Sequence, residues 1–298
     1  MLKLYKPVLA LLFIFSVNAA LAQDNLREQI KSLAAPAKGI VGVSVLGLED
    51  RDTLNYNGNL RLVMHSVMKL PIAMAVLHLV DSGVLTLSQT IHIKKHDLPQ
   101  TYSPLRDKYP DGDVDVSIAD LLSYMVSLSD NDACDILLNY LGGPDQVEYY
   151  LQHSVKVRGI NVEASEADMA KTWEVQYTDW CKPKAIIKLL DTLYTGKALL
   201  PPTRDYLNKL LTVTTTGPHR IKGLLPAGTI VAHKTGTSGT NDVGLSPGTN
   251  DVGVITLPNG KHLAIAIFVC NSTADEATRD NVIATIAKAV YDAEVAKN

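Results

Sequence analysis

The stretch SVMKLPIAMAVLHL, residues 66–79, marks the point where the character of this 298-residue sequence changes. Before it, residues 39–48 and 53–56 are rich in strand-forming side chains and flank a charged turn, which indicates a hairpin. From Ser66 onward, apolar residues recur at helical spacing until Gly83 ends the run. The sequence therefore predicts a strand-rich start that gives way to a helix at residue 66.

Helical periodicity continues to about residue 211, and strand-like sequence then returns. The predicted C-terminal strands cover residues 229–234, 252–257 and 262–269. A long amphipathic pattern at residues 273–296 predicts a closing helix.

Strands at both ends with helices between them predict an α/β (α+β) fold. The two chain ends would build one antiparallel sheet flanked by helices, and the middle would form an inserted all-helical lobe. The two lobes would comprise residues 23–65 together with 212–298, and residues 66–211. Because ligands commonly bind between lobes, we expect the active site in the cleft between them.

The first 22 residues have the pattern of a signal peptide. Lys3 and Lys6 give a positive start, residues 7–17 form an apolar run that is short for a membrane span, and Ala20-Leu21-Ala22 resembles a cleavage site. We expect cleavage near Ala22–Gln23. The product would be a secreted or periplasmic protein without membrane attachment.

Charge and cysteine content exclude several kinds of partner. Removal of Lys3 and Lys6 changes the formal net charge from −3 to about −5 (−3 − 2), so neither nucleic acid nor membrane is an expected partner. Cys134, Cys181 and Cys270 are odd in number and too widely spaced for a zinc site. Cys134 lies in an apolar helical pattern, which predicts a buried structural thiol. We expect a monomer with no metal and no cofactor.

Three short motifs carry the chemistry. Ser66 and Lys69 are three residues apart, so on a helix they share a face and the amine can activate the hydroxyl. Ser129-Asp130-Asn131 precedes a helical run, and Lys234-Thr235-Gly236 follows an apolar strand. Each motif is a weak signal alone, but the three in this order are far less expected by chance.

Taken together, these motifs resemble the signature of the class A serine β-lactamases, and the sequence around Glu166 resembles the PER/VEB-type extended-spectrum branch. The resemblance covers nearly the whole chain after residue 22, including Tyr102-Ser103-Pro104, Thr216-Gly217 and residues 253–255. It implies the fold of β-lactamases and penicillin-recognising transpeptidases. It also implies an enzyme that hydrolyses small-molecule β-lactams, confers resistance and needs no cofactor. A penicillin-binding D,D-peptidase or a β-lactam sensor domain is the alternative.

The resemblance implies a catalytic set. Ser66 would attack the β-lactam carbonyl, and Lys69 would take its proton, a role for which a glutamate–water pair competes. The backbone N–H groups of Ser66 and Thr237 would form the oxyanion hole. Ser129 would pass a proton to the leaving nitrogen.

The resemblance also implies a substrate-binding set. Its members are Tyr102, Asn131, Arg220, Lys234, Thr235, Gly236 and Ser238. Lys234, Thr235 and Thr237 would hold the substrate carboxylate with Arg220 as an added cation, while Asn131 would bind the side-chain amide. Other interpretations stay open. Arg220 could be an ordinary surface charge. Tyr102 would flank the mouth of the cleft, but it could instead be a packing residue. Ser129 and Asn131 could cap a helix.

A base that releases the acyl-enzyme would separate a β-lactamase from a D,D-peptidase. Glu166 falls where the family has its loop glutamate, with Glu163 as a rival if the register slips. The residue after the glutamate, which is proline in the common pattern, is Ala167, so a cis bond there would cost about 3 kcal/mol.

Other positions of this loop depart from the common pattern too. Ala170 replaces an asparagine, Ala164 replaces the arginine partner of Asp179, and Asp135 would bring a second carboxylate close to Glu166. Our hypothesis is that the loop follows a different path and admits bulky oxyimino-cephalosporins.

A five-residue segment occurs twice in the C-terminal part of the sequence. Thr240-Asn241-Asp242-Val243-Gly244 recurs at residues 249–253. Its length is too short for a repeat architecture, so we interpret it as a duplication that lengthens one connection between strands.

Overall fold

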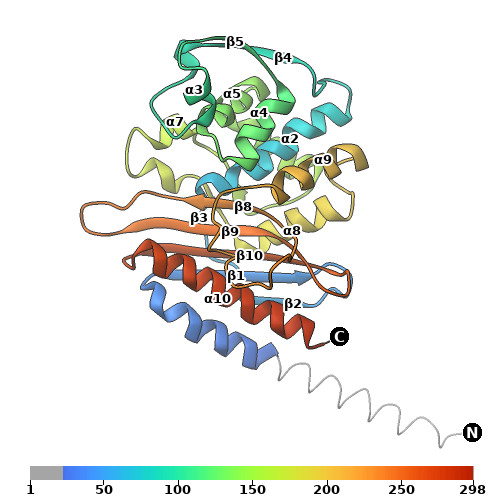
Figure 1. Cartoon of the computed structure of the whole chain (residues 1–298), viewed down its shortest axis with the longest axis vertical. Coiled ribbons are helices and arrows are strands. Elements are labelled where there is room, and N and C mark those ends of the chain that lie inside the picture. The colour runs from blue at the N-terminus through green and yellow to red at the C-terminus, as the bar shows by residue number, and fades with distance from the viewer. Residues whose placement is uncertain (1–22, 298) are drawn as a thin grey trace, which may run out of the picture.

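The computed structural model describes residues 23–297, and its centre is a five-stranded antiparallel sheet of order β2-β1-β10-β9-β8 (Figure 1). The strands are β1 (Ile40–Gly47), β2 (Thr53–Tyr56), β8 (Val231–Thr237), β9 (Ser246–Thr256) and β10 (His262–Ser272). The predicted sheet built from both chain ends is confirmed. In this order β8 is an edge strand, so one of its sides is not paired within the sheet.

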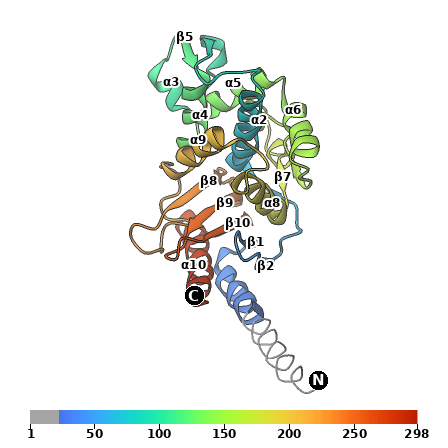
Figure 2. The same cartoon turned by 90° about the vertical axis from the view of Figure 1, so that its right-hand side faces the viewer.

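Helices cover both faces of this sheet (Figure 2). Helix α10 (Glu276–Val295) and the helix of residues 23–34 pack on one face, against side chains such as Ile265 and Ile267. Neighbouring residues of β10, such as Ala266, point to the opposite face and join the core that includes α8. This alternation follows from the two-residue period of a strand, and it explains why residues 263–270 of β10 are all apolar.

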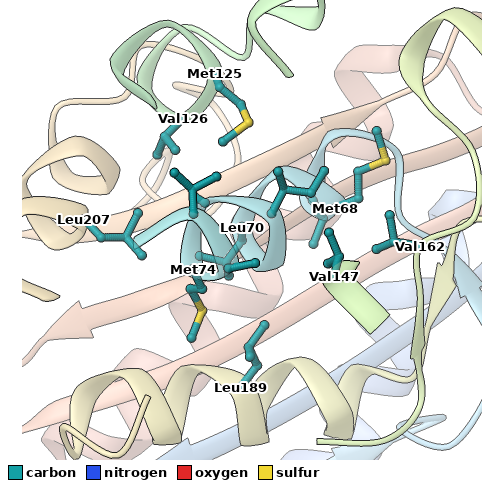
Figure 3. Close-up of a cluster of buried hydrophobic side chains, with 14 of the residues drawn as sticks. Met68, Leu70, Met74, Met125, Val126, Val147, Val162, Leu189 and Leu207 are labelled. Carbon is teal, nitrogen blue, oxygen red and sulfur yellow. The ribbon is translucent and has the colours of Figure 1, made fainter. Parts of the chain in front are cut away.

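The second part of the molecule is built around α2 (Lys69–Asp81), the helix that follows Ser66. Its residues from Lys69 to Leu77 are all buried, as expected for a helix that is apolar on every side. Figure 3 shows Leu70 and Met74 of this helix among side chains from several other elements, including Met125, Val147 and Leu189. The surrounding helices are α3 (Pro104–Lys108), α4 (Ile118–Ser127), α5 (Asn131–Leu141), α6 (Pro144–Tyr149), α7 (Glu166–Met169), α8 (Pro183–Tyr194) and α9 (Pro201–Thr212).

The region between the sheet strands is not purely helical, which corrects one detail of the prediction. Strands β4 (Thr90–Lys94) and β5 (Gly112–Ser117) form a two-stranded ribbon, and β6 (Ile160–Asn161) and β7 (Trp180–Cys181) join β3 (Leu62–Val63) in a small sheet. The ribbon has a sequence signal that the prediction missed, since Ile91 and Ile93 alternate with polar residues. Short turns of other helix types complete the chain: η1 (Ala35–Ala37), η2 (His65–Met68), η3 (Lys95–Asp97), η4 (Tyr150–Ser154) and η5 (Val175–Tyr177).

Two further predictions concern burial and membranes. Cys134 is a fully buried free thiol, as predicted, and Cys181 and Cys270 are buried and free as well. Between residues 23 and 297 no helix is long and apolar enough to cross a membrane. The predicted signal peptide, residues 1–22, lies outside the described residues.

Candidate active site

Ser66 lies in the tight turn η2, which leads directly into α2. The preceding residue, His65, has a φ of 47°, a conformation that few side-chain-bearing residues adopt. Ser66 is half-buried, and its Oγ accepts a hydrogen bond from Lys69 Nζ at 3.1 Å. The turn therefore brings the two ends of the S-x-x-K motif together.

Lys69 is fully buried and has four oxygen partners. Besides Ser66 Oγ, its Nζ donates to the carbonyl oxygen of Ser129 at 2.7 Å and to Asn131 Oδ1 at 2.6 Å. It also forms an ion pair with Glu166 Oε1 at 2.8 Å. One ammonium group thus connects the serine turn, the S-D-N segment and the glutamate.

Asp130 explains why Ser129 and Asn131 are available for these contacts. Its carboxylate is the N-cap of α5, accepting from Ala133 N at 2.8 Å, and it also accepts from Leu105 N at 2.6 Å. The helix cap is therefore Asp130, not either of its neighbours as the alternative interpretation held. Ser129 has a φ of 59°, and this turn presents its carbonyl to Lys69.

Glu166 begins the short helix α7 and faces the serine. Ser66 Oγ donates to Glu166 Oε1 at 3.4 Å, whereas the rival Glu163 is exposed. Asp135 of α5 holds the start of α7, because its two carboxylate oxygens accept from Glu166 N and Ala167 N, each at 2.8 Å. Burial, with a contribution from the charge of Glu166, raises the pKa of Asp135 to about 6.

A second buried carboxylate holds the segment before α7. Asp179 Oδ1 accepts from Glu163 N at 2.7 Å and from Ala164 N at 2.9 Å, while Oδ2 has no partner among the described residues. Burial raises the pKa of Asp179 to about 7. Every peptide bond within residues 23–297 is trans, including the one between Glu166 and Ala167.

Strand β8 carries the third motif along the edge of the sheet. Lys234 is fully buried, and its Nζ donates to Ser129 Oγ at 2.9 Å and to the carbonyl oxygen of Thr235 at 3.0 Å. Burial lowers the pKa of Lys234 well below its usual value, and the charge of Lys69 lowers it further. Thr235 Oγ1 lies 2.6 Å from Thr216 Oγ1, so the two hydroxyls are hydrogen-bonded.

Arg220 lies under β8 and is only 3% exposed, so it is not an ordinary surface charge. Its Nε donates to Asp280 Oδ1 at 2.7 Å, and its Nη1 donates to the carbonyl oxygens of Gly236 and Asn250 at 3.2 and 3.1 Å. Gly217 has a φ of 61°, and a Cβ there would lie 2.6 Å from Thr235 Cγ2. A glycine is therefore required where this segment passes the strand.

Three other predicted binding residues have contacts of their own. A Cβ on Gly236 would lie 2.2 Å from the carbonyl oxygen of Met64, so this glycine lets β8 approach the chain just before Ser66. The Ser238 hydroxyl lies 3.0 Å from that of Ser246 and closes the connection between β8 and β9. Tyr102 is 59% exposed, and its carbonyl oxygen accepts from Asn131 N at 3.0 Å.

Two neighbours of the site did not emerge from sequence reasoning. His65 is buried beside Ser66, and burial lowers its pKa to about 4. Asn250 is fully buried in β9 and contacts the chain before His65. The signal for Asn250 was present in the repeated pentapeptide, but the repeat alone does not indicate which copy faces the site.

The arrangement suits acyl transfer. Ser66 Oγ lies within hydrogen-bonding reach of the Lys69 amine group and the Glu166 carboxylate. The carboxylate can accept the serine proton directly, and the lysine can accept it once it has given up a proton of its own. Ser129 Oγ accepts from Lys234, which leaves its own proton to be donated elsewhere. Beside these hydroxyls Lys234 has no carboxylate at ion-pair distance within residues 23–297, so it can pair with an anion that enters the site.

Comparisons with known proteins agree on one family. Residues 25–293 match the family model described as "Beta-lactamase enzyme family". The chain is 41% identical to Beta-lactamase VEB-1 of Pseudomonas aeruginosa, covering 96% of this chain and 95% of that protein. It is also 41% identical to Extended-spectrum beta-lactamase PER-1 of the same organism, covering 91% and 88%. Among solved structures, TLA-1 extended spectrum Beta-lactamase aligns with a TM-score of 0.90 at 45% identity, covering 92% of this chain and 99% of that one. A beta-lactamase from Chitinophaga pinensis aligns with a TM-score of 0.88 at 48% identity, covering 91% and 99%.

Proposed function

Because the chain belongs to the beta-lactamase enzyme family, as a class A serine β-lactamase, we propose that the residues around Ser66 hydrolyse the β-lactam amide bond in two steps. The observation that carries this proposal is the position of Glu166. Its Oε1 lies 2.8 Å from Lys69 Nζ and 3.4 Å from Ser66 Oγ, so one carboxylate serves both the nucleophile and the amine beside it.

In the first step, Ser66 Oγ attacks the carbonyl carbon and the ring C–N bond breaks. The serine proton leaves to the Lys69–Glu166 pair, and the N–H groups of Ser66 and Thr237 stabilise the oxyanion. Thr237 ends an edge strand, where backbone groups on the unpaired side can serve a ligand. Ser129 gives its proton to the leaving nitrogen, since its oxygen already accepts from Lys234, and it regains a proton at the expense of the one taken up by the Lys69–Glu166 pair, which leaves Glu166 ionised for the second step.

In the second step, water cleaves the ester between Ser66 and the opened ring. Glu166 takes a proton from this water and returns it to Ser66 Oγ as the product leaves. The two buried carboxylates, Asp135 and Asp179, support this step because they hold the backbone on either side of Ser165.

Substrate binding uses the opposite side of the site. The carboxylate of a β-lactam would lie against Lys234, Thr235 and Thr237, with the charge of Arg220 beneath the strand. Asn131 would hold the side-chain amide of the substrate. Its Oδ1 accepts from Lys69 and its Nδ2 donates to Thr101 Oγ1, so the amide is fixed in one orientation.

The substrate range extends to oxyimino-cephalosporins. The support comes from the extended-spectrum names of PER-1 and TLA-1 and from the small residues Ala164, Ala167 and Ala170 that flank the glutamate. Turnover of cefotaxime should therefore be comparable to that of small penicillins. A strong preference for small penicillins, with cefotaxime barely hydrolysed, would contradict this part of the proposal.

Mass spectrometry of the protein during reaction with a cephalosporin tests the mechanism. The natural protein should open the ring rapidly and keep no lasting adduct, whereas Ser66→Ala should form none. Glu166→Ala should accumulate the acyl-enzyme, because Ser66 can still be acylated whereas the water that hydrolyses the ester lacks its base. Full turnover by Glu166→Ala would rule out its role, and a lasting adduct on the natural protein would indicate a peptidase or a sensor instead.

A further inference from the structure

The middle of β9 carries three polar residues, Thr249, Asn250 and Asp251, that are completely buried. Strand β9 lies between β8 and β10, a position where apolar side chains are the rule. Buried polar groups are costly unless they have hydrogen-bond partners. Thr249 Oγ1 accepts from Arg279 of α10, whereas the side chains of Asn250 and Asp251 have partners in the segments that build the active site.

Asn250 holds the chain that leads into the nucleophile. Its Nδ2 donates to the carbonyl oxygens of Val63 and Met64 at 2.9 and 3.1 Å, just before His65 and Ser66. Two residues earlier on the same face, a Cβ on Gly248 would lie 2.7 Å from the His65 ring. This face of β9 is therefore a support for the turn that presents Ser66.

Asp251 points to the other face and connects the two cationic segments of the site. Its Oδ2 accepts from the backbone N–H of Ile221, the residue after Arg220, at 3.1 Å. Its Oδ1 lies 2.8 Å from Nδ1 of His233, the residue before Lys234. A single buried carboxylate thus fixes Arg220 and Lys234 relative to each other.

We propose that Asn250 and Asp251 are positioning residues with separate effects, Asn250 on acylation of Ser66 and Asp251 on binding of the substrate carboxylate. The proposal rests on the function proposed above for Ser66, Arg220 and Lys234. It assigns the two effects to neighbouring residues because successive side chains of a strand point to opposite faces of the sheet.

The first copy of the pentapeptide provides matched controls within the same chain. Asn241 Oδ1 accepts from the backbone N–H groups of Val243 and Leu245 at 3.2 and 2.8 Å, which stabilises only the local turn. Asp242 is exposed. Asn241 and Asp242 thus have the same sequence neighbours as Asn250 and Asp251 without their contacts to the site.

Rapid-mixing kinetics with a chromogenic cephalosporin can separate the substrate dissociation constant from the acylation rate constant. Asn250→Ala should lower the acylation rate about tenfold with little change in the dissociation constant, as expected for lost hydrogen bonds that orient the nucleophile. Asp251→Asn should raise the dissociation constant about tenfold with a smaller effect on acylation, because the amide keeps only one of the two acceptor oxygens that bond Ile221 and His233 and lacks the negative charge near Lys234. Asn241→Ala and Asp242→Asn should leave both constants unchanged.

The concentration of folded protein is determined by circular dichroism for every variant, so that loss of folded protein is not mistaken for slow chemistry. If Asn250→Ala does not accumulate, Asn250→Ser keeps one donor and should recover part of the acylation rate. Equal changes of both constants in both variants, or none, would overturn the proposal. Failure of the natural protein to acylate Ser66 would instead refute the proposed function itself.

Discussion

Lys69 and Lys234 are two lysines on opposite sides of one site, both completely buried and both bonded to Ser129. They differ in their anionic partners. Lys69 pairs with Glu166 at 2.8 Å, whereas no carboxylate within residues 23–297 lies at ion-pair distance from Lys234. Burial accordingly lowers the pKa of Lys234.

The difference indicates two different tasks for one residue type. A buried cation is costly unless it is paired, and the two hydrogen bonds of Lys234 offset only part of that cost, so an anion that binds beside it stabilises it further. A substrate carboxylate is such an anion. Lys69 already has its carboxylate, which suits a group that relays protons between Ser66 and Glu166. The neighbours, and not the burial, determine what each lysine does.

The largest effect is expected from Lys69→Met. Loss of the amine removes one proton acceptor of Ser66 and the partner of Glu166, so the acylation rate should fall about 1000-fold. Quenched-flow mass spectrometry of the Ser66 adduct measures this rate directly. An acylation rate close to that of the natural protein would show that Glu166 alone serves as the base, and Lys69 would then be a structural cation.

Lys234→Met should act mainly on binding. Without the cation, the substrate carboxylate loses a charge-assisted contact with a fully buried group, so the dissociation constant should rise about 100-fold. The same rapid-mixing measurement should show a smaller change in the acylation rate. Equal loss in both constants would mean that Lys234 acts chiefly through the Ser129 hydroxyl, and the contrast between the two lysines would be weaker than proposed.

The same two variants should differ in stability. Lys69→Met leaves the Glu166 carboxylate, itself only 10% exposed, without its cation, so the free energy of unfolding should fall by about 2 kcal/mol. Lys234→Met removes a buried cation that has no carboxylate partner, so unfolding should cost about 1 kcal/mol more. Urea denaturation of the two variants measures both changes. Similar destabilisation by both variants would contradict the difference that we infer between Lys69 and Lys234.

Local chemistry explains which parts of the site were predictable from the sequence. The three-residue spacing predicted that Ser66 and Lys69 share a face, and Asp130 has the residue type and position of a helix cap. The sheet was predictable too, because its strands are rich in strand-forming residues and turn residues separate them. The ribbon β4–β5 was missed because it is short and mostly exposed.

The repeated pentapeptide shows why other parts were not predictable. Asn241 and Asn250 have the same neighbours in sequence, yet Asn241 closes an exposed turn and Asn250 supports the chain before Ser66. Only contacts with residues nearly 190 positions away distinguish the two copies. The same holds for Asp135, whose bonds to Glu166 N and Ala167 N depend on how the loop folds over α5.

The smallest expected effect is a pH dependence of substrate binding that arises from the titration of Lys234 and not of Lys69. The pKa of this lysine is lowered by burial and by the charge of Lys69, and binding of a carboxylate needs its protonated form. The substrate dissociation constant should therefore rise as the pH passes through that lowered pKa, by about tenfold for each further pH unit. Stopped-flow binding measurements from neutral to alkaline pH would follow this change.

The stability of the folded protein should increase with pH, whereas substrate binding weakens. Between the lowered pKa and the ordinary lysine value the unfolded chain binds more protons, so the free energy of unfolding should increase with pH in that window. Lys234→Arg keeps its charge at these pH values and should flatten the binding profile, and Lys234→Met should remove the stability change. If Lys234→Arg retained the alkaline loss of binding, the titrating group would be a different one, and Lys234 would not be the cation that binds the substrate carboxylate.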